Sequence, residues 1–210
     1  MSRIFILNDT NKKGRPRTFD EDEALLIAMK TFWAKGYDGT SMKDLSNAMG
    51  ISGPSIYSAF GDKRELYLKC IDRYSDVDAC APVVAFESQT DIEKAVFEFL
   101  EAVIDYSATN DCAQGVSGCF LASCVSTNVG EVEGVADRMT SAIMGTDTRL
   151  AARFDKEIAK GNLPNNFPSL ARAQLMFDMR QGYVFRGRAG WTAEELKNDL
   201  HERVKMILSV

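Results

Sequence analysis

Apolar side chains recur at helical spacing from Thr18 onward. A first stripe steps by three and four residues, which is the spacing of an amphipathic helix: Leu25, Ala28, Met29, Phe32 and Trp33. Thr18 and Glu21 have the spacing of a capping box, and Gly36 follows the stripe where a left-handed residue commonly ends a helix. The pattern therefore predicts a first helix between Thr18 and Gly36.

Two short helices are predicted directly after the first. Thr40 or Ser41 caps one of them and Gly50 ends it, while Ser52 caps the other and Gly61 ends it. A helix of about eight residues, a tight turn that holds a glycine and a second short helix have the spacing of a helix-turn-helix.

The remainder of the chain also predicts helices, with no strand alternation. Asp62 caps a long helix that runs through Tyr74. Further helical segments are expected over these ranges: 91–109, 119–127, 131–160 with a kink at Gly145, 170–188, and 192–208 behind a capping box of Thr192 and Glu195. The predicted fold class is all-α.

Composition and charge narrow the class of protein. The 210 residues are 45% hydrophobic and 26% charged, which is typical of a globular chain. The net charge of −5 is uneven, because residues 1–74 carry 12 basic and 10 acidic side chains whereas the rest carry 13 and 20. We see neither a signal peptide nor a membrane span, and an odd count of five cysteines fits a reducing compartment. We therefore expect a cytoplasmic protein.

Motifs of catalysis and metal binding are not recognisable. His201 is the one imidazole, and it lies on an amphipathic helix beside Leu200. The run from Gly115 to Cys119 lacks the second glycine of a nucleophile elbow, and neither a Walker loop nor a dinucleotide fingerprint occurs. The cysteine spacing does not fit zinc. We expect no enzyme activity, no cofactor and no metal.

The cysteines allow one alternative function, which depends on reactive thiols. Cys112, Cys119 and Cys124 fall close together, and Cys119 opens a predicted helix whose dipole favours a thiolate. Reactive thiols would make the protein a redox or electrophile sensor that acts through Cys119 and its neighbours. The other interpretation is that cysteines such as Cys70 and Cys124 are small buried apolar residues.

The second short helix has a surface suited to DNA. Its outer face carries the small residues Ser52, Gly53, Ser55 and Ser58, which let the backbone approach bases. Tyr57 adds a hydroxyl that can reach phosphate, and Lys63 opens the next helix, where its charge and the free N–H groups favour an anion. A basic arm that includes Arg15 and Arg17 could enter the minor groove.

Three motifs in this region are similar to one family. They are GRPR at Gly14–Arg17, ALLIAMKTFWAKGYDGTSMKDLSNAMGIS at Ala24–Ser52 and SIYSAFGDKRELY at Ser55–Tyr67. The stretch from Gly14 to Tyr74 resembles the DNA-binding domain of TetR/AcrR (tetracycline-repressor-like) transcriptional regulators. The rest matches more weakly, mainly through GCFLASC at Gly118–Cys124.

The resemblance implies three segments and a set of DNA contacts. The segments are a flexible basic arm (1–17), a helix-turn-helix DNA-binding domain (18–61) and an effector-binding and dimerisation domain (62–210). The implied DNA-binding residues are Arg15, Arg17, Thr40, Ser41, Ser52, Gly53, Pro54, Ser55, Tyr57, Ser58 and Lys63. Many members carry larger residues where Gly53, Ser58 and Ala59 stand here, so the arm and DNA shape would contribute more to recognition.

The resemblance also implies a homodimer on a pseudo-palindromic operator and a small-molecule effector. The dimer would use a four-helix bundle of the last two helices, although their apolar seam would equally suit burial within one subunit. The implied effector-binding residues are Tyr74, Phe97, Leu100, Ile104, Phe120, Cys124, Met139, Ile143, Phe177 and Arg180. The function expected is that of a repressor released by its effector. The alternatives are the thiol sensor and, from another class, a small-molecule-binding helical enzyme.

Overall fold

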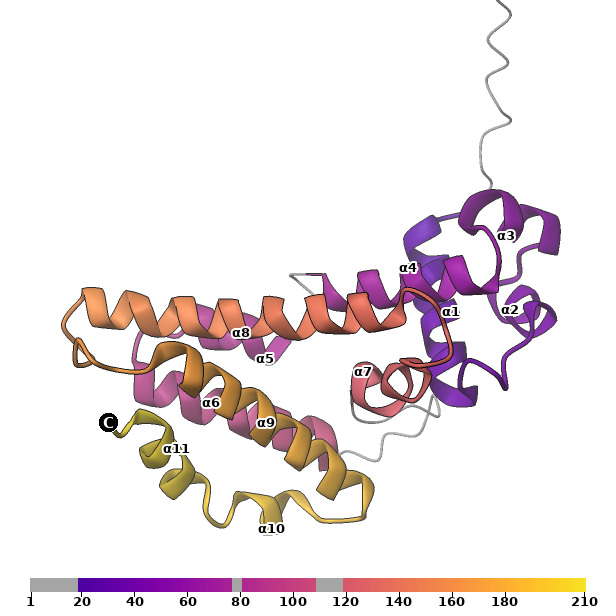
Figure 1. Ribbon diagram of the computed structural model, residues 1–210. Helices are drawn as coiled ribbons and strands as arrows, with labels where there is room; N and C mark the ends of the chain where they lie inside the picture. Colours follow the sequence, from indigo (N-terminus) through magenta and orange to yellow (C-terminus); the bar gives the residue numbers. More distant parts are fainter. Residues whose placement is uncertain (1–18, 77–80, 109–118) are drawn as a thin grey trace, which may run out of the picture.

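The computed structural model describes residues 19–76, 81–108 and 119–210, and within these ranges it contains helices and no strand. The all-α fold class is thus confirmed. The elements are α1 (Glu21–Lys35), α2 (Met42–Met49), α3 (Gly53–Phe60), α4 (Lys63–Ser75), α5 (Ala81–Ser88), α6 (Ile92–Ala108), α7 (Phe120–Ser123), the 3-10 helix η2 (Val125–Asn128), α8 (Val135–Ala159), α9 (Ser169–Arg188), α10 (Ala193–Lys197) and α11 (Leu200–Leu208). In Figure 1, α1, α2 and α3 gather at one end, and the C-terminus lies at the other. Among the described helices, none has the length and apolarity to cross a bilayer.

The first helix begins later than its sequence pattern predicts. Asp20, not Thr18, is the N-cap of α1, and its carboxylate accepts hydrogen bonds from the backbone N–H groups of Asp22 (2.9 Å) and Glu23 (3.1 Å). Thr18 lies outside the described residues. The predicted Thr18 cap is therefore wrong, because aspartate is an equally good N-cap and stands directly before the first turn.

The helix-turn-helix is built as its caps predict. Ser41, rather than Thr40, caps α2 and forms a capping box with Asp44. Gly50 ends α2 with φ of 65°, a left-handed conformation that other residues rarely adopt. Ser52 then caps α3, with the N–H of Ser55 donating to its hydroxyl at 3.4 Å. Local capping thus fixes both the length and the turn of this motif.

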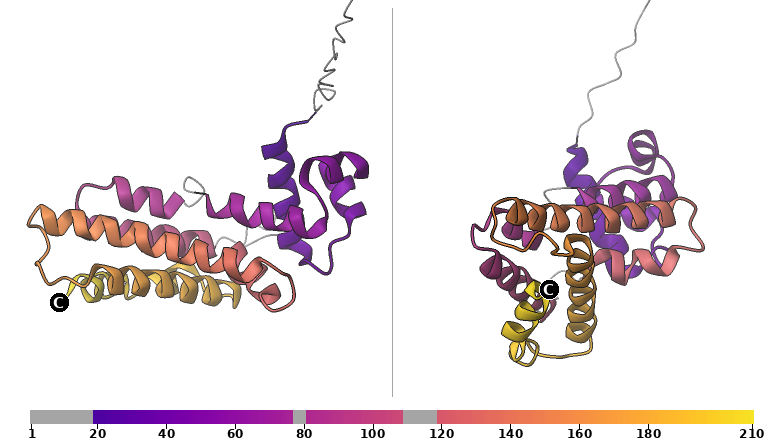
Figure 2. Two further views of the ribbon diagram at one scale, coloured as in Figure 1. Left: turned by 45° about the horizontal axis from the view of Figure 1, so that its top comes forward. Right: turned by 60° about the vertical axis from the view of Figure 1, so that its left-hand side comes forward.

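Buried side chains form two hydrophobic cores. The first core joins α1, α2, α3 and α4 to residues 119–135, together with Val184 of α9. The second core joins α5 and α6 to the distal half of α8 and to α9, α10 and α11. Both views in Figure 2 show α4 leading from the N-terminal helices into the helical body. Since α4 belongs to the first core, residues on both sides of the predicted boundary at 61/62 share one core.

The segment of α7 and η2 packs against the N-terminal helices and is hydrogen-bonded to them. The hydroxyl of Tyr67 donates to Asn128 Oδ1 at 3.2 Å, and Cys124 Sγ donates to the carbonyl of Phe32 at 3.3 Å. The ring of Phe120 packs against Trp33, with 5.4 Å between ring centroids. Any displacement of α7 would therefore disturb α1 and α4.

A close backbone approach joins α6 to α9. A Cβ on Gly187 would stand 2.5 Å from the carbonyl oxygen of Ser107, closer than real Cβ contacts come. Glycine at this position lets the two helices cross in contact.

The C-terminal region differs from its prediction. The Thr192–Glu195 capping box is confirmed, but the predicted continuous helix is divided into α10 and α11 at Asn198 and Asp199, residue types that favour turns over helix interiors. The seam of Leu196, Leu200 and Val204 is 2–3% exposed and packs within the second core. This seam is thus used inside the subunit and does not form the surface of a four-helix bundle between subunits.

Two other elements also depart from the pattern. The helix predicted over 131–160 begins at Val135, because Gly134 precedes it with φ of 85°, and it runs through Gly145 as one element. The helix α5 was not expected from the sequence, where Pro82 and a short apolar run give little periodic signal. The pairing of α5 with α6 and α8 is visible in Figure 1.

Candidate DNA interface and effector cavity

The helix α3 presents a polar outer face on a buried base. Ile56 and Phe60 are 0% and 2% exposed and fix the helix to the first core, whereas Tyr57 is 54% exposed. Ser52, Pro54 and Ser58 are also exposed, while Gly53 and Ser55 are partly so. A Cβ on Gly53 would meet nothing within 4 Å, so the helix start is open to a close approach. Figure 1 shows α3 at the end of the molecule away from the C-terminus.

The residues expected to contact phosphate separate into two groups. Ser41 is exposed at the start of α2, and Lys63 is partly exposed at the start of α4. Thr40 does not join them, because it is 1% exposed and its hydroxyl donates to the carbonyl of Gly36 at 2.6 Å. The expected Thr40 contact is thus corrected to a structural role in the turn before α2. Arg15 and Arg17 lie outside the described residues.

Tyr37 positions the lysine, a role that sequence reasoning missed. The Lys63 Nζ lies 4.1 Å from the centroid of the Tyr37 ring, and this ring stacks on Phe32 at 6.1 Å. A cation–π contact of this kind restrains an otherwise mobile ammonium group. The adjacent glycine and aspartate of the KGYDG segment signal a turn, but they do not reveal that its aromatic ring faces the start of α4.

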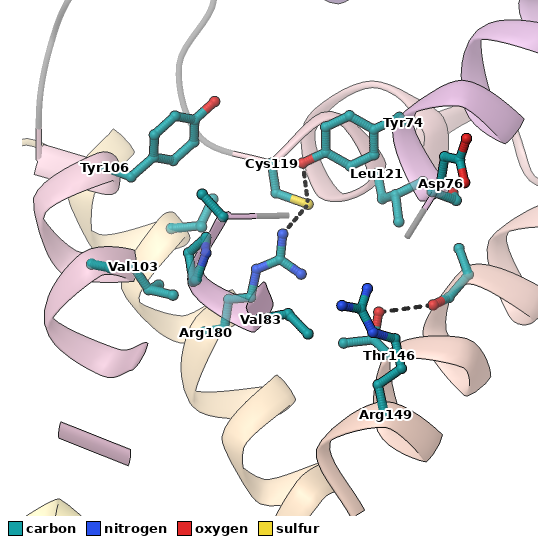
Figure 3. Close-up of a pocket in the computed structure, with 16 residues that line it drawn as sticks. Tyr74, Asp76, Val83, Val103, Tyr106, Cys119, Leu121, Thr146, Arg149 and Arg180 are labelled. Atoms are coloured by element: carbon teal, nitrogen blue, oxygen red, sulfur yellow. Dashed lines mark hydrogen bonds between the residues drawn. The ribbon is translucent and has the colours of Figure 1, made fainter. Parts of the chain in front are cut away.

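A cavity of about 270 Å³ lies where the two cores meet. Tyr74, Cys119 and Leu121 form its wall on the side of the first core, and Val83 and Val103 form its wall on the side of the second. Arg149 of α8 and Arg180 of α9 also line it (Figure 3). An occupant of this cavity would contact both cores at once.

Tyr74 and Cys119 form the polar centre of the cavity. The Tyr74 hydroxyl donates to Cys119 Sγ at 3.6 Å and accepts from the backbone N–H of Phe120 at 3.4 Å. Arg180 Nη2 approaches the same sulfur at 3.9 Å (Figure 3). Burial raises the pKa of the Tyr74 phenol well above its usual value, so this hydroxyl keeps its proton at neutral pH.

The predicted effector residues do not surround one cavity. Tyr74 and Arg180 line the cavity between the cores, whereas Met139, Ile143 and Phe177 line a second hollow of about 570 Å³ between α8 and α9. The remaining five are placed in the cores or at the far side: Leu100, Ile104, Phe120 and Cys124 are buried, and Phe97 lies against His201 with 4.8 Å between ring centroids. These five residues line neither the cavity between the cores nor the second hollow.

Arg149 is a cavity residue that the sequence analysis did not single out. Its guanidinium binds Glu87 of α5 through two hydrogen bonds of 2.8 and 2.6 Å. Ala142, Thr146 and Arg149 are spaced by four and three residues on α8, so they share the helix face that lines the cavity. This spacing indicates a shared helix face, but an apolar stripe does not reveal it because Thr146 and Arg149 are polar.

The described thiols differ in their surroundings. Burial raises the pKa of Cys70 and of Cys124, which keeps both protonated, and neither lines the cavity. Cys119 alone among the described cysteines does so, and Cys112 lies outside the described residues. Within the described ranges, no group of three or more histidine, cysteine, aspartate or glutamate residues could hold a metal ion.

Comparisons with known proteins agree with this architecture. The family model for bacterial regulatory proteins of the tetR family matches residues 25–70. The HTH-type transcriptional repressor ComR of Escherichia coli K12 is 29% identical over 185 residues, covering 88% of this chain and 87% of ComR. The repressor BdcR of the same strain is 26% identical over 193 residues, covering 90% and 95% of the two chains.

A solved structure extends the similarity to the fold. A cysteine mutant of the TetR family transcriptional regulator CifR, complexed with 26-bp double-strand operator DNA, superimposes with a TM-score of 0.75 at 26% identity and covers 92% of this chain and 98% of CifR. The helix-turn-helix, the all-α body and these relatives together lead to one conclusion. The DNA-binding region of this chain is that of the TetR family of bacterial transcriptional regulators, and the chain as a whole is similar to regulators of that family.

Proposed function

We propose that this regulator is a homodimeric repressor that binds a pseudo-palindromic DNA operator through α3 and leaves it when a small-molecule effector enters the cavity between the two cores. The observation that carries the proposal is the placement of α4. Its first residue, Lys63, stands directly after α3, and Tyr74, in its last turn, lines the cavity. One helix of 13 residues, about 20 Å long at 1.5 Å per residue, therefore connects the two candidate sites.

Release would follow from a shift between two conformers. An effector that binds more tightly to the conformer with the wider spacing of the two α3 helices increases the population of that conformer. The two α3 helices then no longer fit two half-sites that lie about 34–36 Å apart. Full release needs roughly 5 kcal/mol of differential affinity for the two conformers. The similarity to ComR and BdcR, both named as repressors, supports repression rather than activation.

DNA binding is tested by fluorescence anisotropy with DNA from the region beside the protein's own gene. Scrambled DNA of equal length is the comparison, at two salt concentrations in reducing buffer. We expect tighter binding to the genuine sequence and a clear loss of affinity in Lys63→Ala. Lys156→Ala removes the same charge from an exposed position near the distal end of α8 and should bind as the unaltered protein does. Equal binding to both DNAs, or equal effects of the two substitutions, would contradict the proposed interface.

We keep the dimer surface on the segments expected from the sequence, 170–188 and 192–208, but on other faces of their helices. The seam of α10 and α11 packs inside the subunit, but α9 and α11 also carry exposed apolar side chains. Leu170, Phe185 and Met206 are 54%, 76% and 58% exposed. We place the homodimer contact on these outer faces, since burying them would supply an apolar interface.

A second candidate function is thiol sensing at Cys119, favoured by the position of its sulfur in the cavity beside Arg180. With hydrogen peroxide, the thiolate would attack one peroxide oxygen and release hydroxide, leaving a sulfenic acid. Oxidant-induced release from DNA should then be lost in Cys119→Ser and retained in Cys124→Ser. A response that survives replacement of Cys112, Cys119 and Cys124 together would exclude this candidate.

A further inference from the structure

The cavity between the cores has a cationic interior. Arg149 and Arg180 come from the neighbouring helices α8 and α9, and Figure 3 shows the head of Arg180 directed toward Cys119 and Tyr74. Most of the remaining wall is apolar, as at Val83 and Val103. Charges placed among apolar groups interact more strongly with a ligand than charges in open water do.

The two arginines are held in different ways. Arg149 is bound by Glu87 through two hydrogen bonds, which direct its guanidinium toward α5. Arg180 approaches Cys119 Sγ at 3.9 Å and lies 5.8 Å from the Phe177 ring centroid. A guanidinium has five N–H donors in a planar fork, a shape that matches a carboxylate.

The one acidic residue among the described residues that line the cavity is exposed. Asp76 lines the cavity and is exposed, as is Ser75 beside it, whereas Arg180 is partly buried. Water screens an exposed charge more than a buried one. The polarity of the cavity therefore favours a ligand whose negative group points inward, toward α9.

The size of the cavity limits the ligand. About 270 Å³ is below the usual range of about 300–1,000 Å³ for sites that hold drug-sized molecules. A cavity of this size has room for a ligand with one polar head and a short apolar body.

We propose that the cavity binds a small organic carboxylate, with its carboxylate on Arg180 and its aromatic or short aliphatic body against Val83 and Val103. This inference rests on the proposed function of the cavity as the effector site. A planar carboxylate matches the fork of a guanidinium through two parallel hydrogen bonds. Binding would also redirect Arg180 from Cys119, the residue that precedes α7, and α7 is locked onto α1 and α4. The ligand head is thus placed next to the segment that connects the cavity to the DNA-binding helices.

The test is titration calorimetry on the full chain with benzoate and hexanoate and with their uncharged amides, benzamide and hexanamide. We expect at least one carboxylate to bind, and its amide to bind about tenfold to a hundredfold more weakly, as expected for loss of a charge-assisted hydrogen bond. In Arg180→Met the acid should lose its advantage over the amide, whereas Arg180→Lys should keep part of it. Arg186→Gln is the matched control, because Arg186 lies on the same helix but stacks on Trp191 at 4.6 Å, away from the cavity lining.

The outcomes separate this inference from the proposed function. Equal affinity for acid and amide, no saturable heat from either acid, or an acid preference that persists in Arg180→Met would overturn the carboxylate assignment. Melting of each ligand-free variant checks its fold, and the acid–amide comparison in the unaltered protein needs no variant at all. Failure of the ligand-free protein to bind operator DNA would instead refute the regulator proposal.

Discussion

Tyr57 is exposed on a helix whose neighbouring side chains, Ile56 and Phe60, are buried. Its hydroxyl is free to donate to a phosphate oxygen, while its ring keeps the same position without it. We expect Tyr57→Phe to weaken operator binding by about twofold to tenfold, since a neutral hydrogen bond contributes roughly 0.5–1.5 kcal/mol. Anisotropy titrations at one salt concentration measure the change.

Tyr37 supplies the matched control for this substitution. Its ring holds Lys63 through its face, which Tyr37→Phe retains, so that variant should bind DNA almost as the unaltered protein does. Unchanged binding in Tyr57→Phe would show that the hydroxyl of Tyr57 does not contact DNA, and a loss in Tyr37→Phe would show that the hydroxyl of Tyr37 also contributes.

Single residues were predictable from the sequence where their role depends on near neighbours. Ser41, Gly50 and Ser52 act within a few residues of their own position, and capping rules identify them. Leu100 and Arg149 depend on which helices meet. In the sequence, a buried core position and an apolar cavity wall both appear as apolar residues at helical spacing, so the pattern does not distinguish them. A polar cavity residue such as Arg149 does not contribute to an apolar pattern.

At the scale of elements, the end of α8 is held by a buried ion pair. Glu157 is fully buried, and its carboxylate accepts hydrogen bonds from Arg153, from Lys160 at 2.8 Å and from Asn162 at 2.6 Å. Arg153 also donates to the carbonyl of Gln89 at 2.7 Å, so the cluster ties α8 to the segment before α6. Burial alone would raise the pKa of Glu157, but these hydrogen bonds outweigh it and lower the pKa to about 2.

This cluster makes stability depend on pH. The folded carboxyl has the lower pKa, so its contribution is complete above the unfolded value of about 4.3 and is lost as pH falls toward about 2. Glu157→Gln should lower the free energy of unfolding at neutral pH by about 3–5 kcal/mol, because it leaves Arg153 buried without its ion pair. Between about pH 5 and 2, the variant should lose less stability than the unaltered protein does. Urea unfolding at several pH values measures both effects, and parallel pH profiles would contradict this account.

The ends of helices depend on tertiary packing as well as on the local sequence pattern. The helix from Thr192 was predicted as one piece because its apolar residues keep a helical step, yet it divides at Asn198 and Asp199 so that both parts cover α6. Helix propensity only weakly disfavours those two residues, and packing decides the outcome. In contrast, the caps of α2, α3 and α4 all agree with their tertiary environment, so their boundaries were readable.

At the scale of the whole molecule, we expect the basic arm to contribute to the dependence of DNA binding on salt. Residues 1–17 carry five basic side chains and one acidic side chain and lie outside the described ranges. Each phosphate that a cation neutralises adds about −0.9 to the slope of log K against log salt. Deleting residues 1–17 should therefore weaken binding and flatten that slope by roughly 2–4. An unchanged slope in a salt titration of the truncated protein would remove the arm from the interface.

Two cores that meet around a cavity could not be read from sequence periodicity. Periodicity predicts which face of a helix is buried, but it does not say in which core. Residues 119–124 illustrate this, because they follow the second-core helix α6 in the chain and yet pack with α1 and α4. The cavity arises from that crossing of the chain, so its lining combines residues that are more than 100 positions apart, such as Tyr74 and Arg180.

The proposed dimer places Phe185 at the contact between subunits. It is 76% exposed on α9, and a carboxylate there would be buried against apolar side chains of the partner at a large desolvation cost. We expect Phe185→Glu to shift the protein toward monomer in analytical ultracentrifugation and to lower operator affinity by at least tenfold, since two linked α3 helices bind far more tightly than one. Met144→Glu is the control, because Met144 is 62% exposed on α8, outside the proposed contact, and should leave the dimer intact. A dimer that survives Phe185→Glu and dissociates in Met144→Glu would move the interface from α9 to α8.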